Sequence, residues 1–137
     1  MMEKITLRAC PKNAGALLAF VTAELVRHGF PAAYHSDVLV AAEEIFVNIA
    51  SYAYPPDKGG EVSVSVSVDR DAVIRFEDMG QPYNPLERGG PNLDVPLIER
   101  EIGGLGIYFV KNLMDKVEYE HKDGKNILTM TKSGVKQ

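Results

Sequence analysis

The chain has 137 residues, of which 45% are hydrophobic and 25% charged, a composition typical of one soluble globular domain. Its formal net charge of -4 gives no basic surface of the kind that binds nucleic acid or an anionic membrane. The single cysteine, Cys10, excludes an intrachain disulfide and is typical of a protein in the cytoplasm. Taken together, these features predict one cytoplasmic domain, residues 1–137, that binds neither nucleic acid nor membrane directly.

The first thirty residues predict a strand followed by a helix. Ile5, Leu7 and Ala9 alternate with polar residues over residues 4–9, which is typical of a strand with one buried face. Asn13 can cap a helix over about residues 14–28, and Gly29 can end it.

A second helix is predicted over residues 39–54, with Ser36 as its N-cap and a pair of prolines as its stop. At 100° per residue, one of its sides is apolar. The opposite side carries four polar residues, Asp37, Glu44, Asn48 and Ser51. Glu44 and Asn48 lie one turn apart and can serve a common ligand, although such a stripe is also what the solvated face of an amphipathic helix looks like.

Two strands of a hairpin follow. In EVSVSVSVD, residues 61–69, valines and serines alternate, which predicts an antiparallel strand with one dry and one wet face. In AVIRFED, residues 72–78, Asp78 has the same parity as Ala72, Ile74 and Phe76. Its carboxylate is therefore predicted to point to the core side of the sheet, at the end of the strand.

The irregular stretch of residues 84–102 contains three prolines and a Gly-Gly pair, and we interpret it as a mobile lid. It leads into GGLG, residues 103–106, and then into an apolar helix over about residues 105–114. Glycines at the start of a helix let phosphate oxygens reach unpaired amides, although a hinge or a close packing contact would also require them. Two closing strands joined by an Asp123-Gly124 turn complete the chain.

The predicted order is therefore β-α-α-β-β-lid-α-β-β. Strands arranged as hairpins with one wet face leave only one face for the helices to cover. This predicts an α/β (α+β) two-layer sandwich, in which a mixed, mostly antiparallel sheet is covered on one face by three helices.

Three of these signals can carry chemistry. A carboxylate that points to the core, as predicted for Asp78, needs a hydrogen-bond donor such as the exocyclic amine of a purine. Gly80 would let a flat ring approach the backbone beside it. The Asp-x-Gly pattern is, however, also common in turns that end a strand. The amide oxygen of Asn48 suits Mg²⁺ that keeps its other bonds for phosphates and water. Glu44 can accept a proton from the group that attacks the terminal phosphate.

These motifs occur in the order E-x-x-x-N on a helix, D-x-G after a strand, and G-x-G opening a helix. The order resembles the Bergerat-type ATP-binding domain shared by histidine kinases, Hsp90, gyrase and MutL. Within that superfamily, three stretches resemble the anti-sigma factor serine-protein kinase branch: Ala42-Glu43-Glu44 through Tyr54-Pro55, DMGQPYNP and GGLGIYFVKNLMDKVEY. The similarity extends over about residues 7–132, nearly the whole chain.

The resemblance implies a role for each matching residue: Glu44 as catalytic base, Asn48 as Mg²⁺ ligand, Asp78 at the adenine amine, Gly80 beside the ring, and Gly104, Leu105 and Gly106 in nucleotide binding along the phosphates. The chain departs from the branch at Tyr52, where many members have histidine, and at Lys125-Asn126, where a threonine that helps bind adenine is common.

What the resemblance implies as a whole is an ATP- and Mg²⁺-dependent kinase. Such a protein phosphorylates a serine of an antagonist (anti-anti-sigma) protein and regulates a sigma factor. The resemblance is also compatible with a homodimer. Three alternatives stay open at this point. They are a histidine-kinase-like module acting in trans, a nucleotide-dependent sequestering module without catalysis, and an enzyme that only hydrolyses ATP.

Overall fold

Five strands form one sheet in the computed structural model, which describes residues 2–55, 59–82 and 110–134. The sheet order is β1-β2-β3-β5-β4, and each of the four neighbouring pairs is antiparallel. The strands are β1 (Glu3–Arg8), β2 (Glu61–Val68), β3 (Asp71–Asp78), β4 (Lys116–Lys122) and β5 (Lys125–Ser133).

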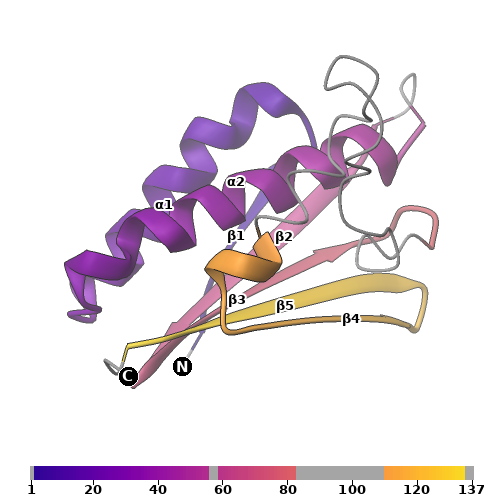
Figure 1. Cartoon of the computed structure of the whole chain (residues 1–137). Coiled ribbons are helices and arrows are strands. Elements are labelled where there is room, and N and C mark those ends of the chain that lie inside the picture. The colour runs from indigo at the N-terminus through magenta and orange to yellow at the C-terminus, as the bar shows by residue number, and fades with distance from the viewer. Residues whose placement is uncertain (1, 56–58, 83–109, 135–137) are drawn as a thin grey trace, which may run out of the picture.

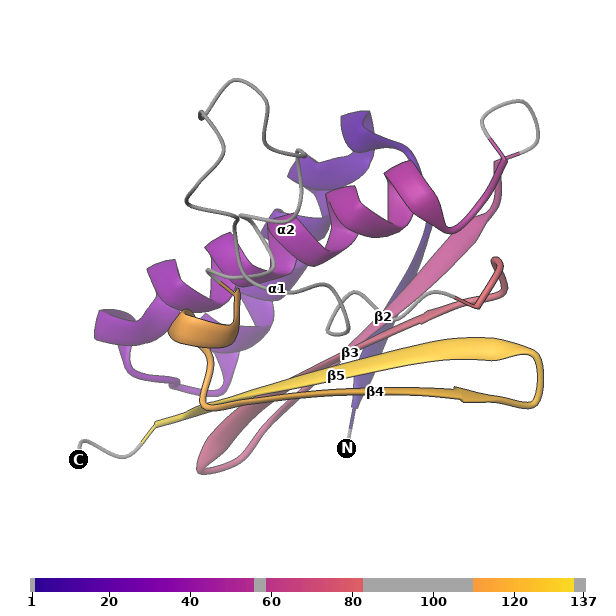
Figure 2. The ribbon, with the colours of Figure 1, turned by 45° about the vertical axis from the view of Figure 1, so that its right-hand side comes forward.

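Helices α1 (Ala14–Arg27) and α2 (His35–Tyr52) lie side by side on one face of this sheet, as Figures 1 and 2 show from two directions. Helical residues 110–113, drawn in orange, lie on the same face and lead into β4. The predicted two-layer α+β sandwich is therefore confirmed, and in the described part of the chain α1, α2 and residues 110–113 cover the inner face of its sheet.

The core lies between the helices and the inner face of the sheet, because the alternation seen in β2 and β3 turns every second side chain toward α1 and α2. Val64 lies opposite Phe76, and Val62 opposite Asp78, so the same parity that buries the valines also buries the Asp78 carboxylate. Each buried apolar side chain contributes about 1.5–3 kcal/mol. The largest fully buried members are Phe46, Phe76, Leu17, Leu25, Ile45, Ile74 and Met130.

The starts of both helices differ in detail from the prediction. Helix α2 begins at His35 after a 3-10 turn (Ala32–Tyr34), so Ser36 lies inside the first turn and the prediction that it is the N-cap is wrong. Asn13 does precede α1, but its side-chain amide donates to the carbonyl of Arg8 at 2.9 Å instead of capping the helix. Side chains that can cap a helix also bond to other nearby backbone groups, and here the local bond to Arg8, five residues earlier, prevails.

Lys132 of β5 connects helical residues 110–113 to α2. Its ammonium group donates to the carbonyl of Leu113 at 2.6 Å and pairs with Asp37 at 3.2 Å. A cation near the last carbonyls of a helix is favourable, because those carbonyls have no partner within the helix. The side chain is 13% exposed, so this contact fixes the end of helical residues 110–113 in a largely dry environment.

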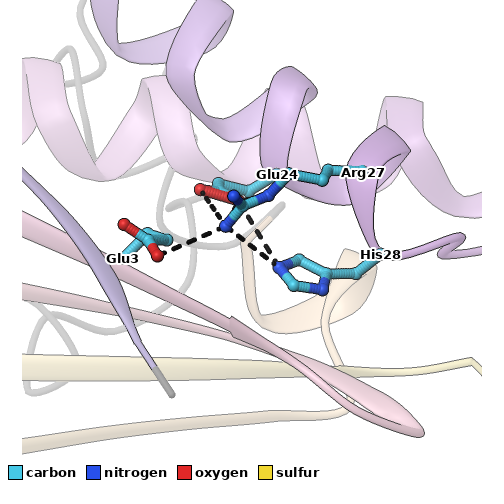
Figure 3. A network of polar contacts seen from close by, with 4 residues as sticks. All are labelled: Glu3, Glu24, Arg27 and His28. Carbon is cyan, nitrogen blue, oxygen red and sulfur yellow. Dashed lines mark hydrogen bonds and ion pairs between the residues drawn. The ribbon is translucent and has the colours of Figure 1, made fainter.

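A polar network ties the end of α1 to the edge strand β1 (Figure 3). Arg27 reaches the nearly buried carboxylate of Glu24 through two nitrogen atoms, at 3.1 and 3.2 Å, and Glu3 of β1 at 3.3 Å. The ring of His28 lies 3.6 Å from Glu24. The fork-shaped guanidinium thus provides the partner that a buried carboxylate requires.

None of the helices in the described residues is both long and apolar enough to cross a membrane.

Candidate functional site

Side chains of α2, of the end of β3 and of β4 and β5 line a small cavity on the covered face of the sheet. Its volume is about 20 Å³, room for about one water molecule, so a larger ligand requires side chains to move. Two residues predicted to bind nucleotide, Asn48 and Asp78, line it together. The other described residues that line it are Ile45, Ile49, Ala53, Tyr119, Asn126 and Leu128.

Asn48 is buried, with 5% of its surface exposed, so of the two interpretations of the polar stripe the solvated face does not hold for this residue. Helix α2 packs against both α1 and the sheet, so its buried arc is wider than the apolar stripe of the sequence. The Asn48 side-chain nitrogen has no hydrogen-bond partner among the described residues. A buried amide without a partner is costly, which makes it a candidate for contact with a ligand.

Asp78 points into the covered layer, as its parity predicted, and is 5% exposed. One carboxylate oxygen, Oδ1, accepts hydrogen bonds from the Gly80 amide and from the Asn126 side chain, both at 2.9 Å. Burial raises the pKa of this carboxyl above its usual range, although the two hydrogen bonds and the nearby His121 act in the opposite direction.

Asn126 was noted in the sequence only as a departure from the kinase branch and was not predicted to be a site residue. It lies on β5 opposite Asp78 and is 5% exposed. The signal for it was available, because Asn126 has the same parity as the apolar residues Leu128 and Met130 and is therefore a polar residue at a core-facing position.

Glu44 is half-buried on α2, one turn before Asn48, and does not line the cavity. Burial, and secondly the adjacent charge of Glu43, raises the pKa of the Glu44 carboxyl above its ordinary value of 4.5. A carboxylate of raised pKa is a better proton acceptor than an ordinary surface glutamate. The structure thus brings Asn48 of α2 and Asp78 of β3 together in one cavity. Glu44 lies on the same helix as Asn48 but outside that cavity.

Gly80 lies against the end of α2, where the amide of Gln81 donates to the Ala53 carbonyl at 2.9 Å. A Cβ atom on Gly80 would lie 2.1 Å from that same carbonyl oxygen. The glycine therefore has a packing reason in this chain, whether or not a ring also approaches it.

We expect Gly80→Ala to lower the free energy of unfolding by about 1–3 kcal/mol, because the contact involves backbone on both sides and cannot relax cheaply. Urea unfolding would measure the change. Gly15→Ala is the control, since a Cβ there meets nothing within 4 Å. A Gly80→Ala protein as stable as the Gly15→Ala protein would contradict the expected close contact.

Tyr54 also stabilises the contact between the end of α2 and the end of β3. Its hydroxyl group donates to the Glu61 carbonyl at 2.6 Å and accepts from the Met79 amide at 2.8 Å. One side chain after α2 therefore connects the start of β2 with the end of β3, which fixes where Asp78 lies relative to Asn48.

The remaining predicted features lie outside the described residues: the lid of residues 84–102, and the loop containing Gly104, Leu105 and Gly106. Among the residues that are described, no cluster of three His, Cys, Asp or Glu side chains could hold a metal ion.

Comparison of the chain with known proteins identifies its family. Residues 7–132 match the model of the histidine kinase-like ATPase domain. The serine-protein kinase RsbW of Bacillus subtilis is 30% identical over 131 residues, covering 90% of this chain and 80% of that protein. The serine/threonine-protein kinase BtrW of Bordetella bronchiseptica is 28% identical over 93 residues, covering 67% of this chain and 66% of that protein.

A solved structure shows the same fold. The crystal structure of the RsbU and RsbW domains of Rv1364c from Mycobacterium tuberculosis superposes with a TM-score of 0.68 at 19% identity. The match covers 97% of this chain but only 32% of the mycobacterial one. With nearly the whole chain matched by the family model, and with RsbW at this identity, the resemblance found in the sequence is confirmed: the chain belongs to the histidine kinase-like ATPase domain family, in the branch of the RsbW serine-protein kinases.

Proposed function

We propose that this protein is an ATP-dependent serine-protein kinase of the anti-sigma factor type. The observation that carries the proposal is the pairing of two buried polar side chains, Asn48 and Asp78, in one cavity. They come from different elements, and one of them has a side-chain nitrogen without a partner. Buried polar groups are normally satisfied within a protein, so this arrangement favours a polar ligand.

Asp78 is the proposed contact of the adenine amine. Its Oδ1 atom already accepts two hydrogen bonds from the protein, which holds the carboxylate in one orientation. An ionised carboxylate only accepts hydrogen bonds, so the group it selects on a purine is an amine and not a carbonyl. Gly80 is proposed to flank the ring, in addition to its packing against Ala53.

Asn48 is the proposed protein ligand of Mg²⁺. Its amide is buried with one atom unpartnered, and rotation of an amide exchanges its oxygen and nitrogen, so the donor set fits a metal that takes one neutral protein oxygen. When bound, Mg²⁺ would neutralise charge on the phosphates. Gly104, Leu105 and Gly106 are proposed to lie along those phosphates.

Glu44 is the proposed general base. The serine hydroxyl of the substrate protein attacks the terminal phosphorus of ATP, a new oxygen–phosphorus bond forms, and the bond to the bridging oxygen of ADP breaks. The hydroxyl proton passes to the Glu44 carboxylate, whose pKa burial has raised toward the working range of a base. ADP leaves with the electron pair of the broken bond.

The proposed substrate is a serine of an antagonist (anti-anti-sigma) protein, and the proposed regulated partner is a sigma factor. The names of the relatives, serine-protein kinases RsbW and serine/threonine-protein kinase BtrW, support the choice of a hydroxyl acceptor on a protein. A homodimer and a cytoplasmic location belong to the same proposal.

The test is phosphate transfer from ATP labelled at its terminal phosphate. We expect the purified protein, with Mg²⁺, to label an anti-anti-sigma protein from the same organism, and we expect no labelling of a substrate variant whose acceptor serine is alanine. Nucleotide-dependent capture of the partner without labelling would instead indicate a sequestering module. Phosphate release that is unaffected by any partner would indicate a simple ATPase.

A further inference from the structure

Asn126 makes an unusually complete set of contacts for a side chain at the edge of a ligand cavity. Its side-chain nitrogen donates to Asp78 Oδ1 and to the Gln81 carbonyl, both at 2.9 Å, and lies 3.4 Å from the Gly80 carbonyl. Its side-chain oxygen accepts from the Tyr119 hydroxyl and lies 3.2 Å from the Nδ1 atom of His121. A primary amide has two donor hydrogens and one acceptor oxygen with two lone pairs, so these contacts use its whole capacity.

This saturation leaves Asn126 with no group to offer a nucleobase, although it lines the same cavity as Asp78 and Asn48. What it can do is hold other groups. It connects β5 with the carboxylate at the end of β3 and with the turn that follows, across 48 residues of sequence. The Gly80 amide bonds to the same oxygen of Asp78, so the carboxylate is held from two sides and cannot rotate freely.

We propose that Asn126 is a positioning residue that determines base specificity by orienting the Asp78 carboxylate toward the exocyclic amine of adenine. The proposal rests on the proposed nucleotide site, and it assigns to Asn126 an action through Asp78 and not a contact with the base. A hydrogen bond to a charged group is among the stronger ones, so losing the orientation should be measurable in the choice between bases.

The experiment compares the dissociation constants of ATP and inosine triphosphate, in which a carbonyl oxygen replaces the exocyclic amine. We expect the wild type to prefer ATP and Asn126→Leu to reduce that preference at least about tenfold, mainly by weakening ATP. A merely structural loosening of the pocket would weaken both nucleotides alike and leave the ratio unchanged. Thr129→Val, on the same strand but on the opposite face of the sheet, is the matched control and should keep the wild-type ratio.

A double-mutant cycle with Asp78→Asn separates action through Asp78 from direct contact with the base. If Asn126 acts through the carboxylate, Asn126→Leu causes little further loss of preference once Asp78→Asn is present. If the two losses simply add, Asn126 acts on the base by itself and the proposal is wrong.

Asn126→Ala is the second variant, for use if the leucine side chain disturbs folding, and thermal unfolding would check both proteins. An unchanged ratio in whichever of the two variants is folded overturns the role of Asn126 while leaving the nucleotide site standing. A wild type that binds neither nucleotide overturns the proposed function itself, so the two failures are distinguishable.

Discussion

Glu44→Gln is expected to bind Mg²⁺-ATP about as tightly as the wild type but to transfer phosphate at least about a hundredfold more slowly. A carboxylate near the terminal phosphate repels it slightly in the ground state, so its removal need not weaken binding. Its benefit arises in the transition state, when the serine hydroxyl loses its proton. Glutamine keeps the size of the side chain and removes its basicity, which isolates that contribution.

The measurement pairs calorimetry of ATP binding with single-turnover labelling of the partner serine. Glu43→Gln is a matched control, because Glu43 is the exposed neighbour whose charge helps to raise the pKa of Glu44. It should retain the maximal rate. A Glu44→Gln protein that labels its partner at the wild-type speed would remove Glu44 from the mechanism.

The raised pKa of Glu44 also predicts how the rate of phosphate transfer depends on pH. The base must be ionised, and its pKa is raised above 4.5, so the rate is complete above the raised pKa and falls as the pH decreases through it. Glu43→Gln removes a negative charge beside Glu44 and therefore lowers that pKa. The acid limb of its rate profile should move to lower pH, and a shift to higher pH would contradict this account.

Asp78→Asn should weaken ATP by about 10- to 150-fold without making the protein less stable at neutral pH. The affinity falls because an amide presents a mixed donor and acceptor where the carboxylate only accepts. The stability is retained because the amide oxygen can still accept from the Gly80 amide and the Asn126 side chain, and because no charge has to be buried.

The sign of the stability effect follows from the raised pKa of Asp78. The carboxyl titrates near 3.8 in the unfolded chain and at a higher pH in the folded protein, so the folded state binds more protons in between. The free energy of unfolding of the wild type therefore falls as the pH rises through this window, and the full cost of the buried charge is present above it. Asp78→Asn has no carboxyl group to ionise at this position, so its free energy of unfolding does not fall for this reason.

Urea unfolding of both proteins, at neutral pH and below the ordinary carboxyl pKa, checks the argument. The variant should equal or exceed the wild type in stability at neutral pH, and its advantage should shrink in acid. Equal ATP affinity of the two proteins, measured by calorimetry, would contradict the adenine assignment. A large loss of stability at neutral pH would show that the carboxylate is favourable in the fold itself.

Patterns of short period carried most of what could be predicted about the fold. The alternation in residues 61–68 and 71–78 assigned the buried face of two strands and, with it, the direction of Asp78. The Asp123-Gly124 turn was correctly expected between the closing strands, and both residues have positive φ, 54° and 77°. These features depend on neighbours in sequence, which is why the sequence alone reveals them.

The side-chain partners at the site depend on residues far apart in the chain, and here the sequence was insufficient. Its polar stripe left open whether Asn48 faces solvent or a ligand, and packing of α2 on both α1 and the sheet decides that it is buried. Only the antiparallel register of β3 and β5 places Asn126 opposite Asp78 and lets the two side chains bond. Periodicity determines which way a side chain points along its own element, but what it meets there is decided by the packing and register of elements that the chain brings together only on folding.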